Sequence, residues 1–202
     1  MEYSEVIRRR RSIRRFLPRE IPDGVIEDVL EAAWSAPQSA MSQPCHFGVV
    51  KDRELRSKLA EAAAGQNWIG EAPVLLAFCV SIAKDFSVAS PDNLPGNIGR
   101  DRFGNDLVEY LGAYKDNRAM RIFWENGSPL IPGQQAYLAA VSHGLSACWV
   151  GHLDMASAGR ILDLPDTMVC LYLMPLGYPA EEPGETWRRP LPDLVFHDRW
   201  RG

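Results

Sequence analysis

The chain alternates between stretches in which apolar residues recur every three or four positions and shorter stretches that are apolar throughout. The first kind predicts amphipathic helices. One short helix around residues 3–7 leads into an arginine-rich block, and another covers residues 25–34, with Asp23 near its start and Pro37 beyond its end. Further helices are predicted after Asp52, around residues 107–114, over residues 129–143, where Gly144 ends the helix, and after Asp154.

The second kind predicts buried strands, because these stretches are too short for typical helices. They cover residues 46–51, 73–80, 146–151 and 168–177. Residues 83–104 are rich in proline, glycine, asparagine and aspartate and predict a long loop, of a length that is usually functional in a compact domain. Helices and strands interleave without any repeat, so residues 1–202 are predicted to form one domain of mixed helices and sheet.

Composition narrows the class of protein. The 202 residues are 46% hydrophobic and 24% charged, which is ordinary for a globular protein and too apolar for disorder. No apolar run approaches the roughly 20 residues of a membrane-spanning helix, and the N-terminus lacks the apolar core of a signal peptide. The four cysteines are scattered and mostly lie in apolar stretches, which favours free thiols in a reducing compartment. We therefore expect a cytoplasmic protein that does not bind a membrane.

Most sequence patterns of catalytic sites are missing from the chain. The histidines show no metal-ligand spacing, so no metal site is expected, and neither a P-loop nor a GxGxxG motif follows a strand. Cys45 lies beside His46, but neighbours in a strand point to opposite faces, so we interpret Cys45 as a small buried residue rather than a nucleophile. The absence of these catalytic patterns favours an enzyme in which a cofactor performs the chemistry.

The arginine-rich block is RRRRSIRRF, residues 8–16, with six arginines in nine positions of a chain whose net charge is −4. Arg10, Arg11 and Arg14 bracket Ser12. Guanidinium groups bind phosphate oxygens in a bidentate manner, and a serine hydroxyl adds a neutral donor. A phosphate pocket, a solvated basic face and a nucleic-acid arm are all compatible with this pattern, but the acidity of the whole chain counts against nucleic acid.

Four segments in order resemble the nitroreductase family of FMN-dependent oxidoreductases. RRSIRRF followed by EAAWSAPQSAMSQPCHFGVV resembles the N-terminal signature of this family. EAPVLLAFCV, QQAYLAAVSHGLSACWVGHLD, and LMPLGYPAEEP with the trailing WRRPLPDLV resemble its later segments. Together these segments cover residues 9–195.

The resemblance implies an α+β sandwich in which helices flank a mostly antiparallel sheet, and an intertwined homodimer with two FMN sites at the subunit interface. It also implies ping-pong hydride transfer from NADH or NADPH to a nitro compound, a quinone or another electron-poor small molecule. Two alternatives stay open: a specialised relative, such as a flavin-dependent dehalogenase or a maturation dehydrogenase, and a non-enzymatic flavin-binding or storage module.

The resemblance also assigns roles to residues of this chain. Those expected at the FMN phosphate are Arg10, Ser12 and Arg14, with Arg11 through its backbone, and either Arg188 or Arg189 from the C-terminal segment. Those expected to reach the flavin from the partner subunit are Pro37, Gln38 and Ser39. Gln43 is also expected to bind the cofactor.

Val150 and Gly151 are expected beside the reactive edge of the flavin ring, where the small glycine leaves a backbone N–H unobstructed. Arg14 is also the candidate for stabilising negative charge on the reduced flavin. The chain departs from the family pattern at Met41 and Cys45, which replace an asparagine and a tryptophan. GQNWIGEAP contains no lysine where some members hold the flavin with one.

Overall fold

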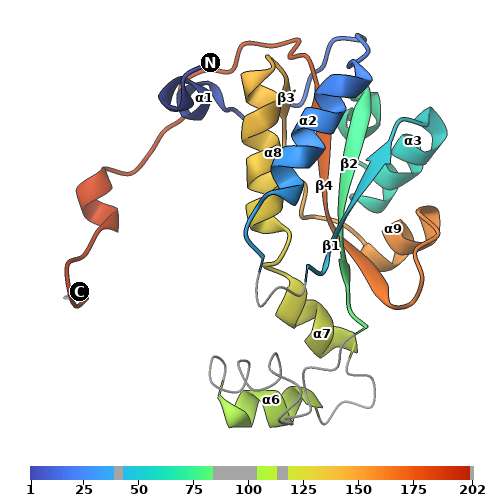
Figure 1. Cartoon of the computed structure of the whole chain (residues 1–202), viewed down its shortest axis with the longest axis vertical. Helices are drawn as coiled ribbons and strands as arrows, with labels where there is room; N and C mark the ends of the chain where they lie inside the picture. The colour runs from blue at the N-terminus through green and yellow to red at the C-terminus, as the bar shows by residue number, and fades with distance from the viewer. Residues whose placement is uncertain (39–42, 84–103, 113–117, 201–202) are drawn as a thin grey trace.

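A sheet lies between two layers of helices in the computed structural model of the chain (Figure 1). The structure describes residues 1–38, 43–83, 104–112 and 118–200. In this described part the sheet order is β1-β2-β4-β3, and all three strand pairs are antiparallel. The strands are β1 (Cys45–Val50), β2 (Val74–Ser81), β3 (Ser146–Ala147) and β4 (Met168–Gly177). The predicted α+β sandwich is therefore confirmed.

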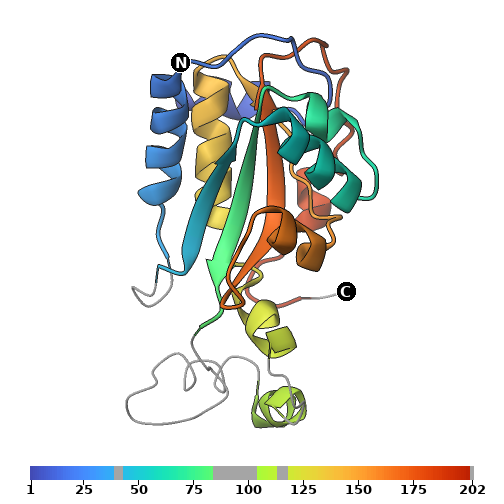
Figure 2. The ribbon, with the colours of Figure 1, turned by 90° about the vertical axis from the view of Figure 1, so that its right-hand side faces the viewer.

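Five of the described helices cover the two faces of the sheet, and the others lie beside it or beyond its end. The described helices are α1 (Tyr3–Arg9), α2 (Asp23–Trp34), α3 (Arg53–Ala62), α4 (Trp68–Glu71), α6 (Asn105–Gly112), α7 (Arg118–Glu125), α8 (Leu130–Ser142), α9 (Met155–Ile161) and the 3-10 turn η2 (Leu191–Leu194). Figure 2 shows α2 and α8 on one face, with α3, α4 and α9 on the other. None of the helices in the described ranges is long and apolar enough to cross a membrane.

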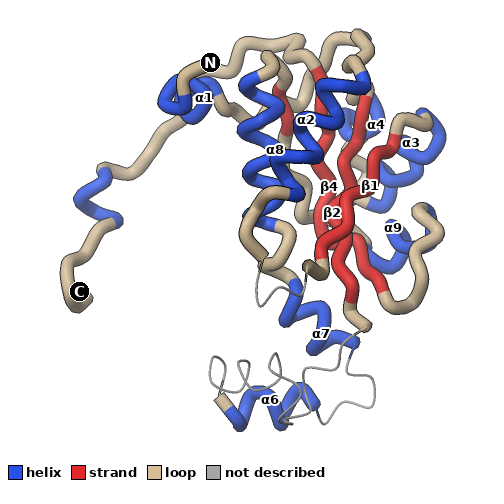
Figure 3. Tube along the Cα trace, viewed as in Figure 1, coloured by secondary structure: helices blue, strands red, loops and turns tan. Residues whose placement is uncertain are grey.

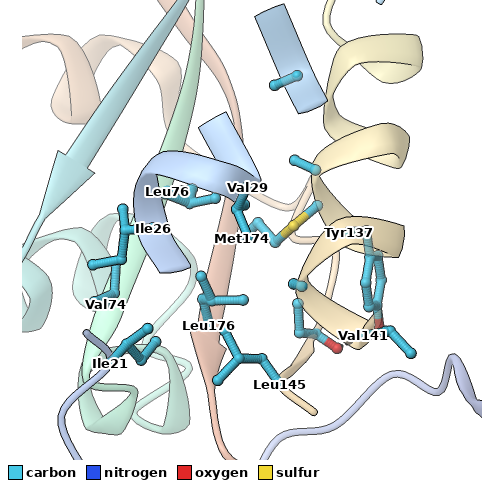
Figure 4. Packing of buried hydrophobic residues seen from close by; sticks show 14 of the residues in the cluster. Ile21, Ile26, Val29, Val74, Leu76, Tyr137, Val141, Leu145, Met174 and Leu176 are labelled. Atoms are coloured by element: carbon cyan, nitrogen blue, oxygen red, sulfur yellow. Dashed lines mark hydrogen bonds between the residues drawn. The ribbon is translucent and has the colours of Figure 1, made fainter. Parts of the chain in front are cut away.

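The face beneath α2 and α8 holds the largest of the buried hydrophobic clusters (Figure 4). Val29 of α2 and Tyr137 of α8 are fully buried against Met174 and Leu176 of β4. Burying a side chain of this size contributes about 1.5–3 kcal/mol. This packing holds α8, and therefore Tyr137, against the sheet.

Two aspartates begin the helices on the opposite face, as the sequence predicts. The Asp52 carboxylate accepts a hydrogen bond from the Leu55 N–H at 2.8 Å at the start of α3. The Asp154 carboxylate accepts from the N–H groups of Ala156 and Ser157 at the start of α9. The N–H of Asp154 donates to the carbonyl of Ala62, which joins the start of α9 to the end of α3.

The strand predicted over residues 146–151 is shorter in the structure. β3 ends at Ala147, and only an isolated bridge between Val150 and Leu173 continues the pairing. The chain leaves the ladder where the Trp149 indole packs on Gly133, at which an added Cβ would lie 2.2 Å from the ring. The predicted loop over residues 83–104 and the end of the helix predicted over 107–114 fall largely outside the described residues.

The C-terminal segment leaves the sheet after Gly177 and then runs beside the end of the arginine-rich block. The Leu17 N–H donates to the Tyr178 carbonyl, and the Ala180 N–H donates to the Arg15 carbonyl, both at 2.9 Å. Residues 182–200, here called the tail, then lie away from the layered body (Figure 3). Every tail residue is exposed, including large hydrophobic residues: Trp187, Leu191, Leu194, Val195, Phe196 and Trp200.

Candidate functional site

The arginine-rich block runs in extended form beside β3. Ser12 forms a parallel bridge with Ala147, and the Ile13 N–H donates to the Ala147 carbonyl at 3.0 Å. Ile13 is buried, whereas Ser12 and Arg14 are exposed. Because successive side chains of an extended chain point to opposite sides, Arg10, Ser12 and Arg14 share one side of this segment.

Arg10 and Arg14 flank Ser12 in the chain, and the guanidinium group of each lies over an aromatic ring. The Arg10 guanidinium carbon is 5.8 Å from the centre of the Tyr137 ring, and that of Arg14 is 5.7 Å from the Trp68 ring. Among the ion pairs of the described residues, none involves Arg10 or Arg14. Two guanidinium groups on either side of a hydroxyl, neither of them in an ion pair of the described residues, suit a phosphate. One carboxylate does lie beside the segment, because Glu181 accepts a hydrogen bond from the backbone N–H of Arg14 at 3.0 Å.

Cys148 is buried and follows Ala147, the bridge partner of Ser12. Burial raises the pKa of its thiol, whereas the charge of Arg14 and the hydroxyl of Ser12 lower it. We call Arg10, Ser12 and Arg14 the anion cluster.

Arg11 points to the other side of the segment, toward the tail. Its Nη1 donates to the Gly184 carbonyl and, at 2.8 Å, to the Thr186 hydroxyl. The structure thus separates the Arg11 side chain from the anion cluster. A backbone contact of Arg11 with phosphate stays a prediction.

Arg188 and Arg189 follow directly after this attachment point in the tail. Arg189 donates to the Asp193 carbonyl at 3.4 Å. None of the hydrogen bonds found among the described residues joins either arginine to the anion cluster. Their assignment to the phosphate stays a prediction.

Val150 and Gly151 differ in what their backbone can offer a ligand. The Val150 N–H donates to the Leu173 carbonyl at 2.9 Å, so the sheet already uses it. Gly151 is exposed, and its N–H has no acceptor within the described ranges. Of the predicted pair, Gly151 therefore holds the available donor.

The anion cluster and Gly151 lie along the same edge of the sheet. Ala147, next to Ser12, pairs with Leu176, and Val150 pairs with Leu173. Three residues along a strand span about 10 Å. This arrangement, with an anion site at one end and the Gly151 N–H at the other, suits a ligand that joins a phosphate to a planar ring.

Pro37, Gln38 and Gln43 lie toward the other end of the sheet. The Gln38 side-chain oxygen accepts from the N–H of Cys45, which pairs with Val80, whereas Leu176 pairs with Val74. Val74 and Val80 are six residues apart, or about 20 Å. Within one chain these residues therefore stay apart from the anion cluster. Ser39 and Met41 lie outside the described residues.

Cys45 does not have the properties of a nucleophile. Burial, with a contribution from the negative charge of Glu125, raises its pKa to about 12. The thiol is therefore protonated at neutral pH, which agrees with its interpretation as a packing residue.

A cavity lies between α3 and α9, and its lining includes His152, the residue after Gly151. It has a volume of about 790 Å³ and its lining includes Lys58 and Arg160. Both cations already have partners, because Lys58 pairs with Glu54 at 2.6 Å and Arg160 donates to the Ser157 hydroxyl at 2.8 Å. The anion cluster is therefore the better candidate for a phosphate.

Two aromatic residues of the site were missed by sequence reasoning. Tyr137 was predicted only as part of a buried helix, and nothing in the sequence connects it to residue 10. Trp68 stands in GQNWIGEAP, a segment that the resemblance links to the flavin through a lysine absent from this chain. The position of Trp68 in a segment expected near the flavin was the one feature of the sequence that could have indicated its role.

Comparison with known proteins connects this geometry to a family. The sequence model described as the nitroreductase family matches residues 7–178. The chain belongs to the nitroreductase family. It is accordingly an oxidoreductase, as expected from the four resembling segments.

Three similar proteins illustrate the range of this family. The chain is 31% identical to an NADH dehydrogenase of Thermus thermophilus, over 96% of this chain and 93% of the relative. It is 28% identical to an iodotyrosine deiodinase of Haliscomenobacter hydrossis, over 89% of this chain and 80% of the relative. The structure of the NADPH:FMN oxidoreductase of Vibrio harveyi complexed with NAD+ is 25% identical with a TM-score of 0.73, covering 99% of this chain and 78% of that one.

Proposed function

We propose that this nitroreductase-family protein binds FMN and transfers hydride from NADH or NADPH to a nitro compound, a quinone or another electron-poor small molecule. The observation that carries the proposal is the backbone N–H of the exposed residue Gly151, about 10 Å along the sheet edge from the anion cluster. FMN, when bound, supplies the hydride-transfer chemistry. The names of the flavin- and nicotinamide-dependent relatives support the same assignment.

The residues of the chain would bind and orient the flavin. Arg10, Ser12 and Arg14 bind its phosphate, and each charge-assisted hydrogen bond contributes about 1.5–3 kcal/mol. Gly151 donates its N–H to the edge of the ring. Arg14 is also the candidate to stabilise negative charge on the reduced ring.

We further propose that two copies of the chain form an intertwined homodimer with two such sites. Within one chain, about 20 Å along the sheet separates the Gln38 end from the anion cluster, which supports a dimer. In the dimer, the residues Pro37, Gln38, Ser39 and Gln43 would serve the site of the other copy. The exposed hydrophobic residues of the tail also need a covering surface. Arg188 or Arg189 then closes the phosphate site. We place the protein in the cytoplasm, where free thiols such as its four cysteines persist.

The test begins with the colour of the protein purified under native conditions. We expect a yellow protein that releases FMN, rather than FAD, on denaturation, and whose absorbance bleaches on anaerobic mixing with NADH or NADPH. A colourless protein that FMN cannot reconstitute would contradict the proposal. Bound FMN that neither nicotinamide reduces would indicate a storage module instead.

A specialised reductive activity is the second candidate, because one relative is named a deiodinase. A panel of acceptors separates the two. Rapid turnover of nitroaromatics or quinones supports the general reductase, whereas halide release from a halogenated phenol without quinone reduction supports the dehalogenase.

A further inference from the structure

One buried hydroxyl joins helix α8 to the arginine-rich block and to the sheet. The side chain of Tyr137 is 0% exposed. Its hydroxyl lies 2.7 Å from the carbonyl oxygen of Arg11 and 2.5 Å from that of Ala147. The Ala147 carbonyl also accepts the N–H of Ile13, so three chain segments meet at this point.

The hydroxyl must keep its proton to hold these carbonyls. Burial raises the pKa of Tyr137 to about 12, against the opposing charge of Arg10 and the hydroxyl of Ser12. The phenol is therefore a neutral donor at physiological pH. Its single proton is shared between two carbonyl oxygens, both of which would lose a partner if the hydroxyl were removed.

The ring of the same residue supports the anion cluster. The Arg10 guanidinium lies over it at 5.8 Å, within the range of a cation–π interaction. The hydroxyl holds the backbone of the next residue, Arg11. Tyr137 thus fixes both the backbone of the segment and the direction of one of its cations.

We propose that Tyr137 is a positioning residue for phosphate recognition. It acts through Arg10, Ser12 and Arg14 by holding the segment in register on β3, and it does not itself touch the ligand. The inference rests on the proposed function, because it assumes that the anion cluster binds the phosphate of FMN. A tyrosine that served only to fill the core would stabilise the fold without favouring a phosphorylated ligand.

The test compares FMN with riboflavin, which lacks the phosphate. Dissociation constants for both are measured by flavin fluorescence on the full chain after removal of flavin, for the wild type and Tyr137→Phe. We expect the wild type to prefer FMN, and the substitution to reduce that preference about tenfold while changing riboflavin affinity about twofold or less, since losing one such hydrogen bond costs about 1.4 kcal/mol. Ser142→Ala is the matched control, because it removes a hydroxyl from the same helix whose hydrogen bond, to the Ala139 carbonyl at 2.7 Å, stays within that helix.

A double-mutant cycle with Arg10→Ala provides a second readout. If Tyr137 acts through the anion cluster, Tyr137→Phe should cost less FMN affinity in the Arg10→Ala background than in the wild type. An unchanged FMN preference, equal loss of both flavins, or strictly additive effects would overturn the inference while leaving FMN binding intact. A wild type that binds riboflavin as tightly as FMN would overturn the phosphate assignment itself, and this inference with it.

Discussion

The guanidinium carbon of Arg14 lies 5.7 Å from the centre of the Trp68 ring, although 54 positions separate the two residues in the chain. Trp68 begins α4, in the segment where some family members are expected to hold the flavin with a lysine. Here an aromatic face supports a cation that another segment supplies. Arg14 of the arginine-rich block thus supplies a positive charge beside the segment that lacks the lysine.

Trp68→Leu should weaken FMN binding about two- to fivefold. The substitution removes the ring beneath Arg14, and a partly exposed cation–π interaction contributes about 0.5–1 kcal/mol. Trp68→Phe keeps an aromatic face and should retain most of the affinity. Isothermal titration with FMN measures both variants, and equal affinity of Trp68→Leu and the wild type would show that the ring does not support Arg14.

Arg14→Ala and Ser12→Ala should each weaken FMN binding, and Arg14→Ala the more. A charge-assisted hydrogen bond contributes about 1.5–3 kcal/mol, so we expect a loss of roughly ten- to a hundredfold for Arg14→Ala. Arg15→Ala is the control, because its exposed side chain belongs to neither the anion cluster nor the tail contact. Fluorescence titration decides, and unchanged FMN retention in Arg14→Ala would remove it from the phosphate site.

Arg11→Gln should release the tail without removing a member of the anion cluster. Its guanidinium donates to the Gly184 carbonyl and the Thr186 hydroxyl, which anchor the beginning of the tail. We expect faster tryptic cleavage after Arg188, followed by mass spectrometry of the released C-terminal peptide. Arg8→Gln, whose side chain bonds within α1, is the control. Identical cleavage rates for Arg11→Gln and the wild type would mean that this contact does not anchor the tail.

Gly133→Ala should destabilise the protein, whereas Gly159→Ala should not. An added Cβ at Gly133 would lie 2.2 Å from the Trp149 indole, and overpacking of this kind typically costs about 1–3 kcal/mol. Nothing lies within 4 Å of a Cβ added at Gly159 of α9, where alanine would favour the helix by up to about 1 kcal/mol. Thermal unfolding measures both, and an equal or higher melting temperature for Gly133→Ala would contradict the close packing.

Cys45→Ala should make the protein less sensitive to alkaline pH. The folded-state pKa of Cys45 is about 12, above the ordinary value of 9.0, so the folded chain keeps a proton that the unfolded chain loses. The free energy of unfolding therefore falls as pH rises from about 9 toward 12, and this contribution is absent in the variant. Urea unfolding at pH 7 and pH 10 measures the difference, and an identical pH dependence in the two proteins would refute the shift.

Much of the fold follows from local patterns in the chain. Continuous apolar runs predicted β2 and β4, and apolar spacing with an aspartate at the start predicted α3 and α9. These predictions held because burial of a strand and capping of a helix involve residues close together in the sequence. The short α4 and the exposed tail carry no such period. The strand after Ser146 was predicted too long, because its end depends on Gly133 of another element.

The sequence by itself determined the strands β2 and β4, the capped helices α3 and α9, the presence of a concentrated anion-binding candidate and the family. The tertiary structure alone decided where these side chains lie: Arg10 over the Tyr137 ring, Arg14 over the Trp68 ring, and Arg11 against the tail. It also decided that Tyr137, 126 positions from Arg11, holds that segment in place. Both follow from contacts between residues distant in the chain, because which elements pack together sets the side to which each arginine points, and no local pattern records that packing.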